Sequence, residues 1–183
     1  CIGIQPEYKH FGTMNIVNSK RGTYYIADTL VNQHPDKETL KDIARLTANT
    51  IRFFNEEPKI AGISFSSFGV DKTGSPRLMH DVVAELQAED PNLKIDGEMT
   101  VDLALDHKRR DEKYPFLRLH GENVNSMIFT SLSAANSAYR LIKQFSPETE
   151  VIGPIQMGLN KPIHFTDFDS SVRDIVNITA VAV

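Results

Sequence analysis

The sequence has little cysteine, no long apolar run and no excess of basic residues. Cys1 is the only cysteine among 183 residues, which excludes an internal disulfide framework and indicates a reducing compartment. No apolar run approaches the ~20 residues of a membrane-spanning helix, and no secretory signal opens the chain. The formal net charge is −4, so the chain offers little electrostatic attraction to nucleic acid or to an anionic membrane. We therefore expect a cytoplasmic protein that binds neither nucleic acid nor membranes.

The common motifs for nucleotides and metal ions are also missing. The segment GVDKTGS at 69–75 has glycines at near P-loop spacing, but Ser75 stands where a P-loop needs its phosphate-binding lysine. No G-x-G-x-x-G string occurs. The six histidines never fall at a paired metal-ligand spacing, and one cysteine cannot build a zinc cluster. We interpret 69–75 as a surface loop and expect no metal site.

Strand-like and helix-like segments alternate about five times along the chain, which predicts an α/β fold with a largely parallel sheet and right-handed crossovers. The segment 34–55 has apolar residues three and four apart and Asp36 as its N-cap, so it is typical of an amphipathic helix. A strand pair is expected at 13–29. Further strands are expected at 59–67, 93–102, 125–132 and 150–158, and further helices at 76–89, 133–145 and from Ser170 onward.

Carboxylates and amides gather where the expected strands end. In such sheets a ligand lies beyond the carboxyl ends of the strands, so these side chains could orient hydroxyl or amide groups of a ligand. Asp, Asn and Ser at strand ends are also ordinary turn and helix-cap residues, and we favour this structural interpretation. The residues concerned are Asp28, Asn32, Asp96, Glu98, Asp102 and Asn136.

The segment NKPIHFTDFDSSVRDIVN at 160–177 predicts an extended Lys-Pro stretch, a polar loop and a new helix. Ser171 and Asp174 have the spacing of a capping box, in which each side chain bonds the backbone N–H of the other. A helix start favours anions, yet Asp167 and Asp169 would repel a phosphate at this one. His164 is expected to be solvated or bonded to the backbone. The loop is thus an active site, the remains of one, or a helix cap.

Several of these strings together resemble the phosphotransacetylase family. The strings are ADTLVNQHPDKETLKDIA, IDGEMTVDLAL, MIFTSLSAANSAYRLIKQF and VIGPIQMGLNKPIHF…SSVRDIVNITAVAV, and the resemblance runs from about residue 13 to residue 183. It implies a two-domain α/β fold related to isocitrate dehydrogenase, with the active site between the domains. Residues 1–153 would be the second, inserted domain, and 154–183 a return segment of the first domain. Because the chain lacks an initiator Met and stops inside an apolar stretch, we expect most of that first domain upstream of Cys1.

The resemblance also assigns roles within the loop. In phosphotransacetylases a serine after the Lys-Pro pair hydrogen-bonds at the thioester, an arginine binds phosphate, and a helix aspartate is the general base. Asp167, Phe168 and Asp174 stand at these three positions, so only the aspartate is kept. Phe cannot replace the bidentate contact of a guanidinium, and we name no catalytic residue. The expected ligand-binding residues are Gly153, Pro154, Lys161, Asp167, Phe168 and Asp174.

One subset of the family departs from the pattern at the same place. The C-terminal phosphotransacetylase-like domains of bacterial NADP-dependent malic enzymes carry a histidine after the Lys-Pro pair, here His164, and lack the Ser-Arg pair. This resemblance implies a regulatory domain that senses acetyl-CoA and forms a homo-oligomer. Oxidative decarboxylation of malate, with NADP and Mg²⁺ or Mn²⁺, would belong to an N-terminal part outside this chain. Two alternatives stay open: an active phosphate acetyltransferase with a divergent loop, and a piece that only drives oligomerisation.

Overall fold

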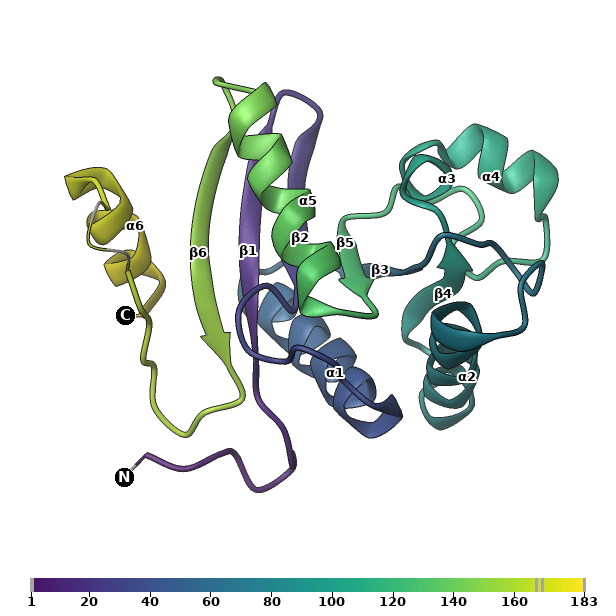
Figure 1. Cartoon of the computed structure of the whole chain (residues 1–183), viewed down its shortest axis with the longest axis horizontal. Coiled ribbons are helices and arrows are strands. Elements are labelled where there is room, and N and C mark those ends of the chain that lie inside the picture. Colours follow the sequence, from purple (N-terminus) through teal and green to yellow (C-terminus); the bar gives the residue numbers. More distant parts are fainter. Residues whose placement is uncertain (1, 167, 169, 183) are drawn as a thin grey trace.

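The computed structural model describes residues 2–166, 168 and 170–182, which form one six-stranded sheet with helices on both faces (Figure 1). The strand order across the sheet is β4-β3-β5-β2-β1-β6. The strands are β1 (Gly12–Ser19), β2 (Gly22–Ala27), β3 (Lys59–Ile63), β4 (Lys94–Met99), β5 (Ser126–Phe129) and β6 (Glu150–Met157). The helices are α1 (Lys37–Phe53), α2 (Gly74–Glu89), α3 (Val101–Leu105), α4 (His107–Lys113), α5 (Leu132–Phe145) and α6 (Val172–Ala182).

The predicted fold class, an α/β fold with a mostly parallel sheet, is confirmed. Neighbours β4, β3, β5 and β2 pair in parallel, whereas β1 pairs antiparallel with both β2 and β6. The expected strand pair at 13–29 is the β1–β2 hairpin, with Met14 opposite Ala27 and Ser19 opposite Gly22. The last helix begins at Val172, two residues later than expected, because Ser170 and Ser171 lie before its first turn.

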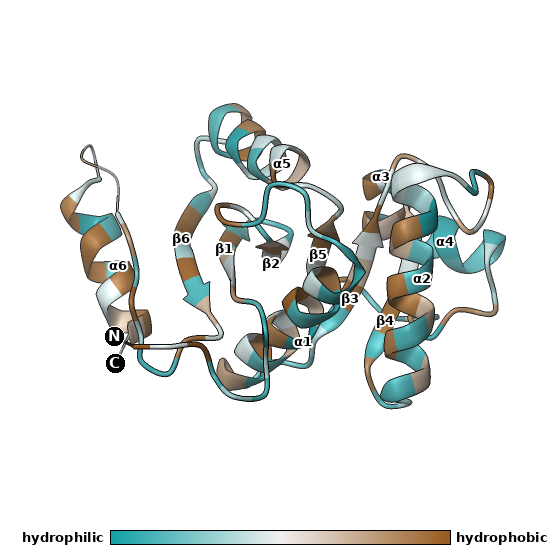
Figure 2. Ribbon diagram, turned by 60° about the horizontal axis from the view of Figure 1, so that its bottom comes forward, coloured by the Kyte–Doolittle hydropathy of each residue, from teal (hydrophilic) through white to brown (hydrophobic). Residues whose placement is uncertain are grey.

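Two hydrophobic clusters hold helices against the sheet, and Figure 2 shows the apolar residues spaced along α1 and α2. Because side chains alternate along a strand, Met14 and Ile16 of β1 face α1 and α2, while Val17 faces the side of α3 and α5. The amphipathic α1 buries Leu40 and Ile43 completely in the first cluster. Each such side chain contributes roughly 1.5–3 kcal/mol by leaving water, so this packing fixes the position of β1.

Helices α1 and α2 are further joined by ion pairs around Lys41. Its ammonium lies 2.9 Å from a Glu85 carboxylate oxygen and 2.7 Å from one of Glu89. These hydrogen bonds raise the pKa of Lys41 well above its ordinary value, although burial opposes the shift. At the start of α1, the predicted Asp36 cap is confirmed, since its carboxylate accepts the Thr39 backbone N–H at 2.9 Å.

The outer edge of the sheet is β6, and it contains an irregularity. Met14 pairs with Ile155 and Ile16 with Ile152, so Gly153 and Pro154 together stand opposite a single residue of β1. This is a β-bulge. Proline is tolerated there because an edge strand has a free side and a bulge breaks the ladder. The expected domain boundary between 153 and 154 falls inside β6, and the division into two domains remains a prediction.

Helix α6 lies alongside β6 at this edge of the molecule (Figure 1). Ile178 is its one buried residue, and Val172 and Val176 are exposed. Among the described residues, no helix is both long and apolar enough to cross a membrane.

Candidate functional site

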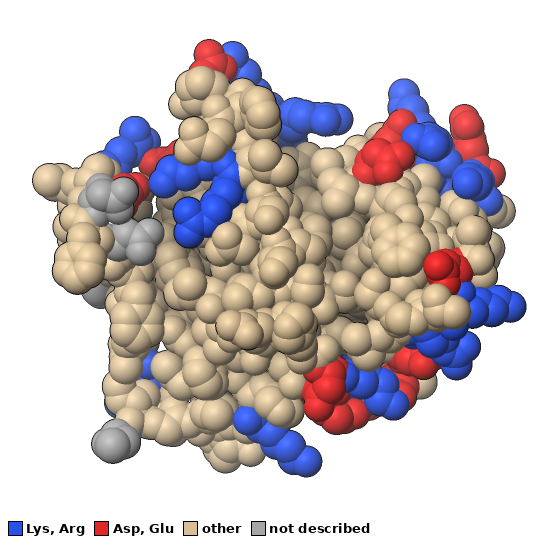
Figure 3. All heavy atoms as spheres, viewed as in Figure 1, with Lys and Arg blue, Asp and Glu red and all other residues tan. Residues whose placement is uncertain are grey.

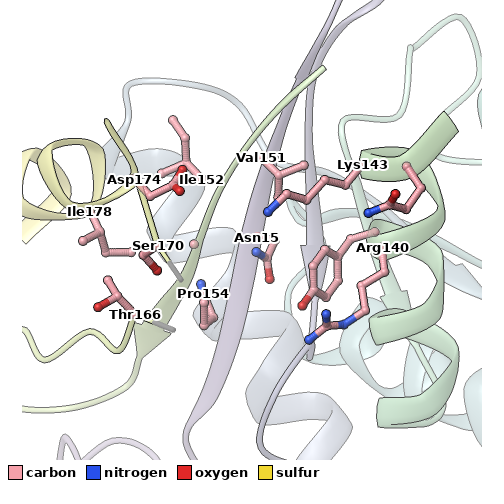
Figure 4. Close-up of a pocket in the computed structure, with 13 residues that line it drawn as sticks. Asn15, Arg140, Lys143, Val151, Ile152, Pro154, Thr166, Ser170, Asp174 and Ile178 are labelled. Carbon is pink, nitrogen blue, oxygen red and sulfur yellow. The ribbon is translucent and has the colours of Figure 1, made fainter. Parts of the chain in front are cut away.

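A cavity of about 410 Å³ opens between α5, β6 and α6, next to the predicted loop (Figure 4). Helix α5 contributes side chains from one flank, α6 and the preceding loop from the other, and β1 and β6 form the floor. The lining residues are Asn15, Tyr139, Arg140, Lys143, Gln144, Val151, Ile152, Gly153, Pro154, Thr166, Ser170, Asp174 and Ile178.

The positive charge in this cavity comes from α5. Arg140 and Lys143 are three residues apart, which places them on one face of the helix, and both extend toward β1 and β6 (Figure 4). The Arg140 Nε donates to Asn136 Oδ1 at 2.8 Å, and its guanidinium lies 5.4 Å from the centre of the Tyr139 ring. Figure 3 shows basic side chains gathered over β6 between α5 and α6. Among the described residues, neither Arg140 nor Lys143 forms an ion pair within 4.0 Å.

Across the cavity, Asp174 is engaged in the capping box that the sequence predicts. Its Oδ2 accepts the Ser171 backbone N–H at 2.9 Å and the Ser171 hydroxyl at 2.8 Å, and Ser171 Oγ accepts the Asp174 N–H at 3.2 Å. These bonds, with smaller contributions from Lys143 and Arg173, hold the pKa of Asp174 below its ordinary value. The carboxylate therefore stays charged near neutral pH, as a helix cap requires.

The floor of the cavity contains a buried amide, Asn15, at the bulge between β1 and β6. Asn15 is 2 % exposed, and its Oδ1 accepts the Thr29 hydroxyl at 2.6 Å. Thr29 in turn lies 3.4 Å from the Thr13 hydroxyl, which donates to Asp28. Asn15 therefore belongs to a buried polar network that reaches from the hairpin to the cavity.

His164 lies behind the loop and makes the backbone bond that we expect. Its Nδ1 accepts the Gln156 N–H at 3.1 Å, which requires that nitrogen to be unprotonated. Burial lowers the pKa of His164, because the charged imidazolium is poorly solvated there. The imidazole therefore ties the loop to β6 in its neutral form.

The structure brings together only some of the residues expected to bind a ligand. Gly153, Pro154 and Asp174 line the cavity. Lys161 and Phe168 are exposed and are not part of its lining, and the Phe168 side chain is fully exposed. The expected residue Asp167 lies outside the described residues, as does Asp169.

Sequence reasoning missed the residues that give the cavity its polarity. Asn15 is the lone amide within the strand sequence TMNIV, and an amide inside an otherwise apolar strand is a detectable signal. Arg140 and Lys143 share the spacing of one helix face, which could have been read from AYRLIKQ once the position of α5 was known.

The polar residues at strand ends bond other parts of the chain, some nearby in sequence and some distant, which supports a structural role. Asp28 accepts the Asn32 N–H at 2.8 Å, and Asn136 Nδ2 donates to the Thr29 carbonyl at 3.0 Å. Asp96 accepts the Leu119 N–H at 2.7 Å, and burial raises its pKa. Glu98 accepts the Gly69 N–H at 2.6 Å, and Asp102 pairs with Arg109 at 3.0 Å.

Within residues 2–166, 168 and 170–182, no three His, Cys, Asp or Glu side chains are grouped closely enough to hold a metal ion.

Comparisons with known proteins relate the chain to two kinds of enzyme. It is 38% identical over 172 residues to NADP-dependent malic enzymes of Salmonella typhimurium and Escherichia coli, covering 94% of this chain and 22% of each relative. It is 36% identical over 165 residues to a phosphate acetyltransferase of Clostridium acetobutylicum, covering 90% of this chain and 49% of that protein. The chain thus spans about a quarter of the malic enzymes and half of the acetyltransferase.

A solved structure has the same fold over nearly the whole chain. The EutD phosphotransacetylase from Staphylococcus aureus superposes with a TM-score of 0.90 at 27% identity, over 99% of this chain and 56% of that protein. The sequence pattern described as phosphate acetyl/butaryl transferase matches residues 1–183. The chain therefore belongs to the phosphate acetyl/butaryl transferase family.

Proposed function

We propose that the chain is the phosphotransacetylase-like part of a malic enzyme, and that it binds acetyl-CoA as a regulatory ligand without transferring the acetyl group. Oxidative decarboxylation of malate, with NADP and a divalent cation, belongs in this proposal to a part of the protein outside the chain. The similarity to NADP-dependent malic enzymes over 94% of the chain supports the assignment.

One observation carries the proposal: the loop sequence lacks the serine and the arginine that the family resemblance implies. Asp174 is held in the capping box by Ser171. The segment 162–172 contains no Lys or Arg, and the exposed Phe168 stands where the family resemblance implies an arginine. Acyl transfer to phosphate depends on preorganised positive charge at the reacting oxygen atoms, and this segment supplies no Lys or Arg.

The cavity nevertheless has the chemistry of a binding site for a CoA ester. Arg140 and Lys143 provide cations for phosphate groups at its mouth. Val151, Ile152 and Ile178 provide apolar contact area for a pantetheine-like chain. Because these residues come from α5, β6 and α6, a ligand that touches all three favours one arrangement of these elements over others.

Two assays on the full-length protein test the proposal. Calorimetry measures acetyl-CoA binding directly, and a coupled assay measures acetyl phosphate formation from acetyl-CoA and inorganic phosphate. We expect saturable binding with no acetyl phosphate formed above the uncatalysed rate. The variant Lys143→Gln should bind acetyl-CoA about tenfold more weakly, through loss of one charge-assisted contact. Lys20→Gln, on the exposed hairpin turn and paired with Glu148, is the matched control.

The alternative function, an active phosphate acetyltransferase, keeps support from Asp174 and from the similarity to the Clostridium acetobutylicum enzyme. Turnover of acetyl-CoA and phosphate that is lost in Asp174→Asn, while the protein remains folded, would establish this alternative and overturn the proposal. Absence of acetyl-CoA binding to the wild type would overturn both. A piece that only drives oligomerisation would show an unchanged oligomeric mass and no heat of binding when acetyl-CoA is added.

A further inference from the structure

Asn15 is a buried amide, and among the described residues only its oxygen has a side-chain hydrogen-bond partner. It lies in the middle of β1, is 2 % exposed, and lines the cavity. Its Oδ1 accepts the Thr29 hydroxyl, but its Nδ2 donates to no described residue. A donor that faces the cavity and has no partner among the described residues is placed to bind a ligand atom that accepts from it.

The orientation of this amide is fixed by its neighbours. Thr29 donates to Oδ1, which turns Nδ2 away from Thr29. The Thr29 backbone is held in its turn by Asn136, whose Nδ2 donates to the Thr29 carbonyl at 3.0 Å. Thr13 and Asp28 complete the network behind Thr29. Asn15 is thus preorganised rather than free to rotate.

The β-bulge keeps the space in front of this amide open. A Cβ on Gly153 would lie 2.8 Å from Asn15 Nδ2 and 2.9 Å from the Met14 carbonyl oxygen. Any side chain at 153 would therefore collide with the amide. Pro154, the other bulge residue, lines the same cavity beside Asn15 (Figure 4).

The polar groups of the cavity lie at two depths. Arg140 and Lys143 are exposed and lie at the mouth, whereas Asn15 lies at the floor. A ligand with phosphate groups at one end and a carbonyl group at the other matches this arrangement. A neutral amide donor is suited to a carbonyl oxygen, and cations are suited to phosphates.

We propose that the Nδ2 of Asn15 is the donor that binds the thioester carbonyl of an acyl-CoA, and that Thr29 is the residue that positions it. The proposal rests on the proposed function for the identity of the ligand. It assigns recognition of the acyl group to the sheet floor, and recognition of the phosphates to α5.

Binding of acetyl-CoA and of free CoA to the full-length protein separates the two contributions. Asn15→Asp replaces the donor by a carboxylate of the same shape, and should weaken acetyl-CoA binding about tenfold or more. Free CoA, which has no thioester carbonyl, should bind this variant within about twofold of wild type. Asn49→Asp makes the same chemical change on α1, outside the cavity, and should alter neither affinity.

Thr29 variants provide a second test if Asn15→Asp does not fold. Thr29→Val removes the hydroxyl and should weaken acetyl-CoA binding about threefold, whereas Thr29→Ser keeps the hydroxyl and should retain the wild-type affinity. Free CoA binding to both variants should be unchanged. A purely structural role would instead change the binding of both ligands equally, together with the unfolding temperature.

The outcomes distinguish the two proposals. If acetyl-CoA binds the wild type and Asn15→Asp binds it equally well, the role of Asn15 is overturned and the proposed function stands. If the wild type binds acetyl-CoA no more tightly than CoA, the acyl recognition by Asn15 is likewise overturned. If neither CoA compound binds the wild type, both proposals fail. Selective loss of acetyl-CoA affinity in Asn15→Asp and Thr29→Val supports both.

Discussion

Asp174 stands at the family position of a general base, and in the structure its carboxylate also caps the start of α6. The family resemblance makes it a general base, but in the structure Oδ2 accepts two hydrogen bonds from Ser171. Both bonds stabilise the charged form, so the pKa of Asp174 falls below its ordinary value. The contribution of this carboxylate to stability is present above the unfolded pKa and is lost as the pH falls through the folded pKa.

The capping box gives the first prediction. Ser171→Ala removes the hydroxyl that bonds Asp174, and should destabilise the protein by about 1 kcal/mol, as is usual for an N-cap. The pKa of Asp174 should rise toward its ordinary value. Urea unfolding measures the free energy, and an NMR titration of the carboxyl group measures the pKa. Ser170→Ala, one residue earlier, should change neither; an unchanged pKa in Ser171→Ala would contradict the account.

Gly153 gives a second prediction, because both its backbone conformation and its surroundings require glycine. Its φ is +136°, and a Cβ would come within 2.8 Å of Asn15 Nδ2. We expect Gly153→Ala to cost about 1–3 kcal/mol in unfolding free energy through strain, with a further loss from the collision. Gly22→Ala is the matched control, since Gly22 has φ +124° but no atom within 4 Å of its Cβ position. Equal losses in the two variants would show that backbone strain alone explains glycine at 153.

At the scale of elements, the segment between β6 and α6 depends on a neutral histidine. Burial lowers the pKa of His164, so the unfolded chain, with an ordinary pKa of 6.5, binds a proton more readily than the folded one. The free energy of unfolding is therefore unaffected by His164 above the unfolded pKa. It declines as the pH falls from 6.5 toward the folded pKa. Protonation also removes the acceptor for the Gln156 N–H.

The lowered pKa of His164 gives a third prediction. Between about pH 8 and pH 5 the wild type should lose stability to urea, and His164→Asn should lose less, because its amide oxygen can accept the Gln156 N–H at every pH in this range. Hydrogen exchange of the Gln156 amide reports the same bond locally. An identical pH dependence in the two proteins would show that His164 does not control this segment.

Most elements could be predicted from the sequence because they follow from short-range patterns. Helix α1 has an apolar face, and Asp36 caps it at the predicted place. The Ser171–Asp174 capping box depends only on residues three apart. The β1–β2 hairpin likewise joins neighbouring segments.

The cavity could not be predicted in the same way, because it depends on contacts between distant segments. Asn15 reaches it only because β1 pairs with β6, which lies more than a hundred residues later in the chain. The family resemblance predicts a site in the loop at 160–177, whereas the basic residues of the cavity come from α5. No local pattern reveals that these two segments face each other.

At the scale of the whole molecule, the cavity lies where a ligand could influence the arrangement of α6. The sheet and α5 form one side of the cavity, and α6 packs against β6 with only Ile178 buried. A ligand that binds one arrangement of α6 more tightly shifts the equilibrium toward it, and typical couplings are about 1–3 kcal/mol. Under the proposed function, regulation of a catalytic part outside the chain requires no chemistry at this site, only such a difference in affinity.

The initial rate of NADP-dependent malate decarboxylation by the full-length protein, titrated with acetyl-CoA, tests this account most directly. We predict a saturable change in rate, with a midpoint shifted about tenfold to higher acetyl-CoA concentration in Lys143→Gln and unchanged in Lys20→Gln. A rate that is independent of acetyl-CoA at every concentration would contradict the proposed regulatory role of the domain, as would a midpoint that Lys143→Gln leaves unchanged.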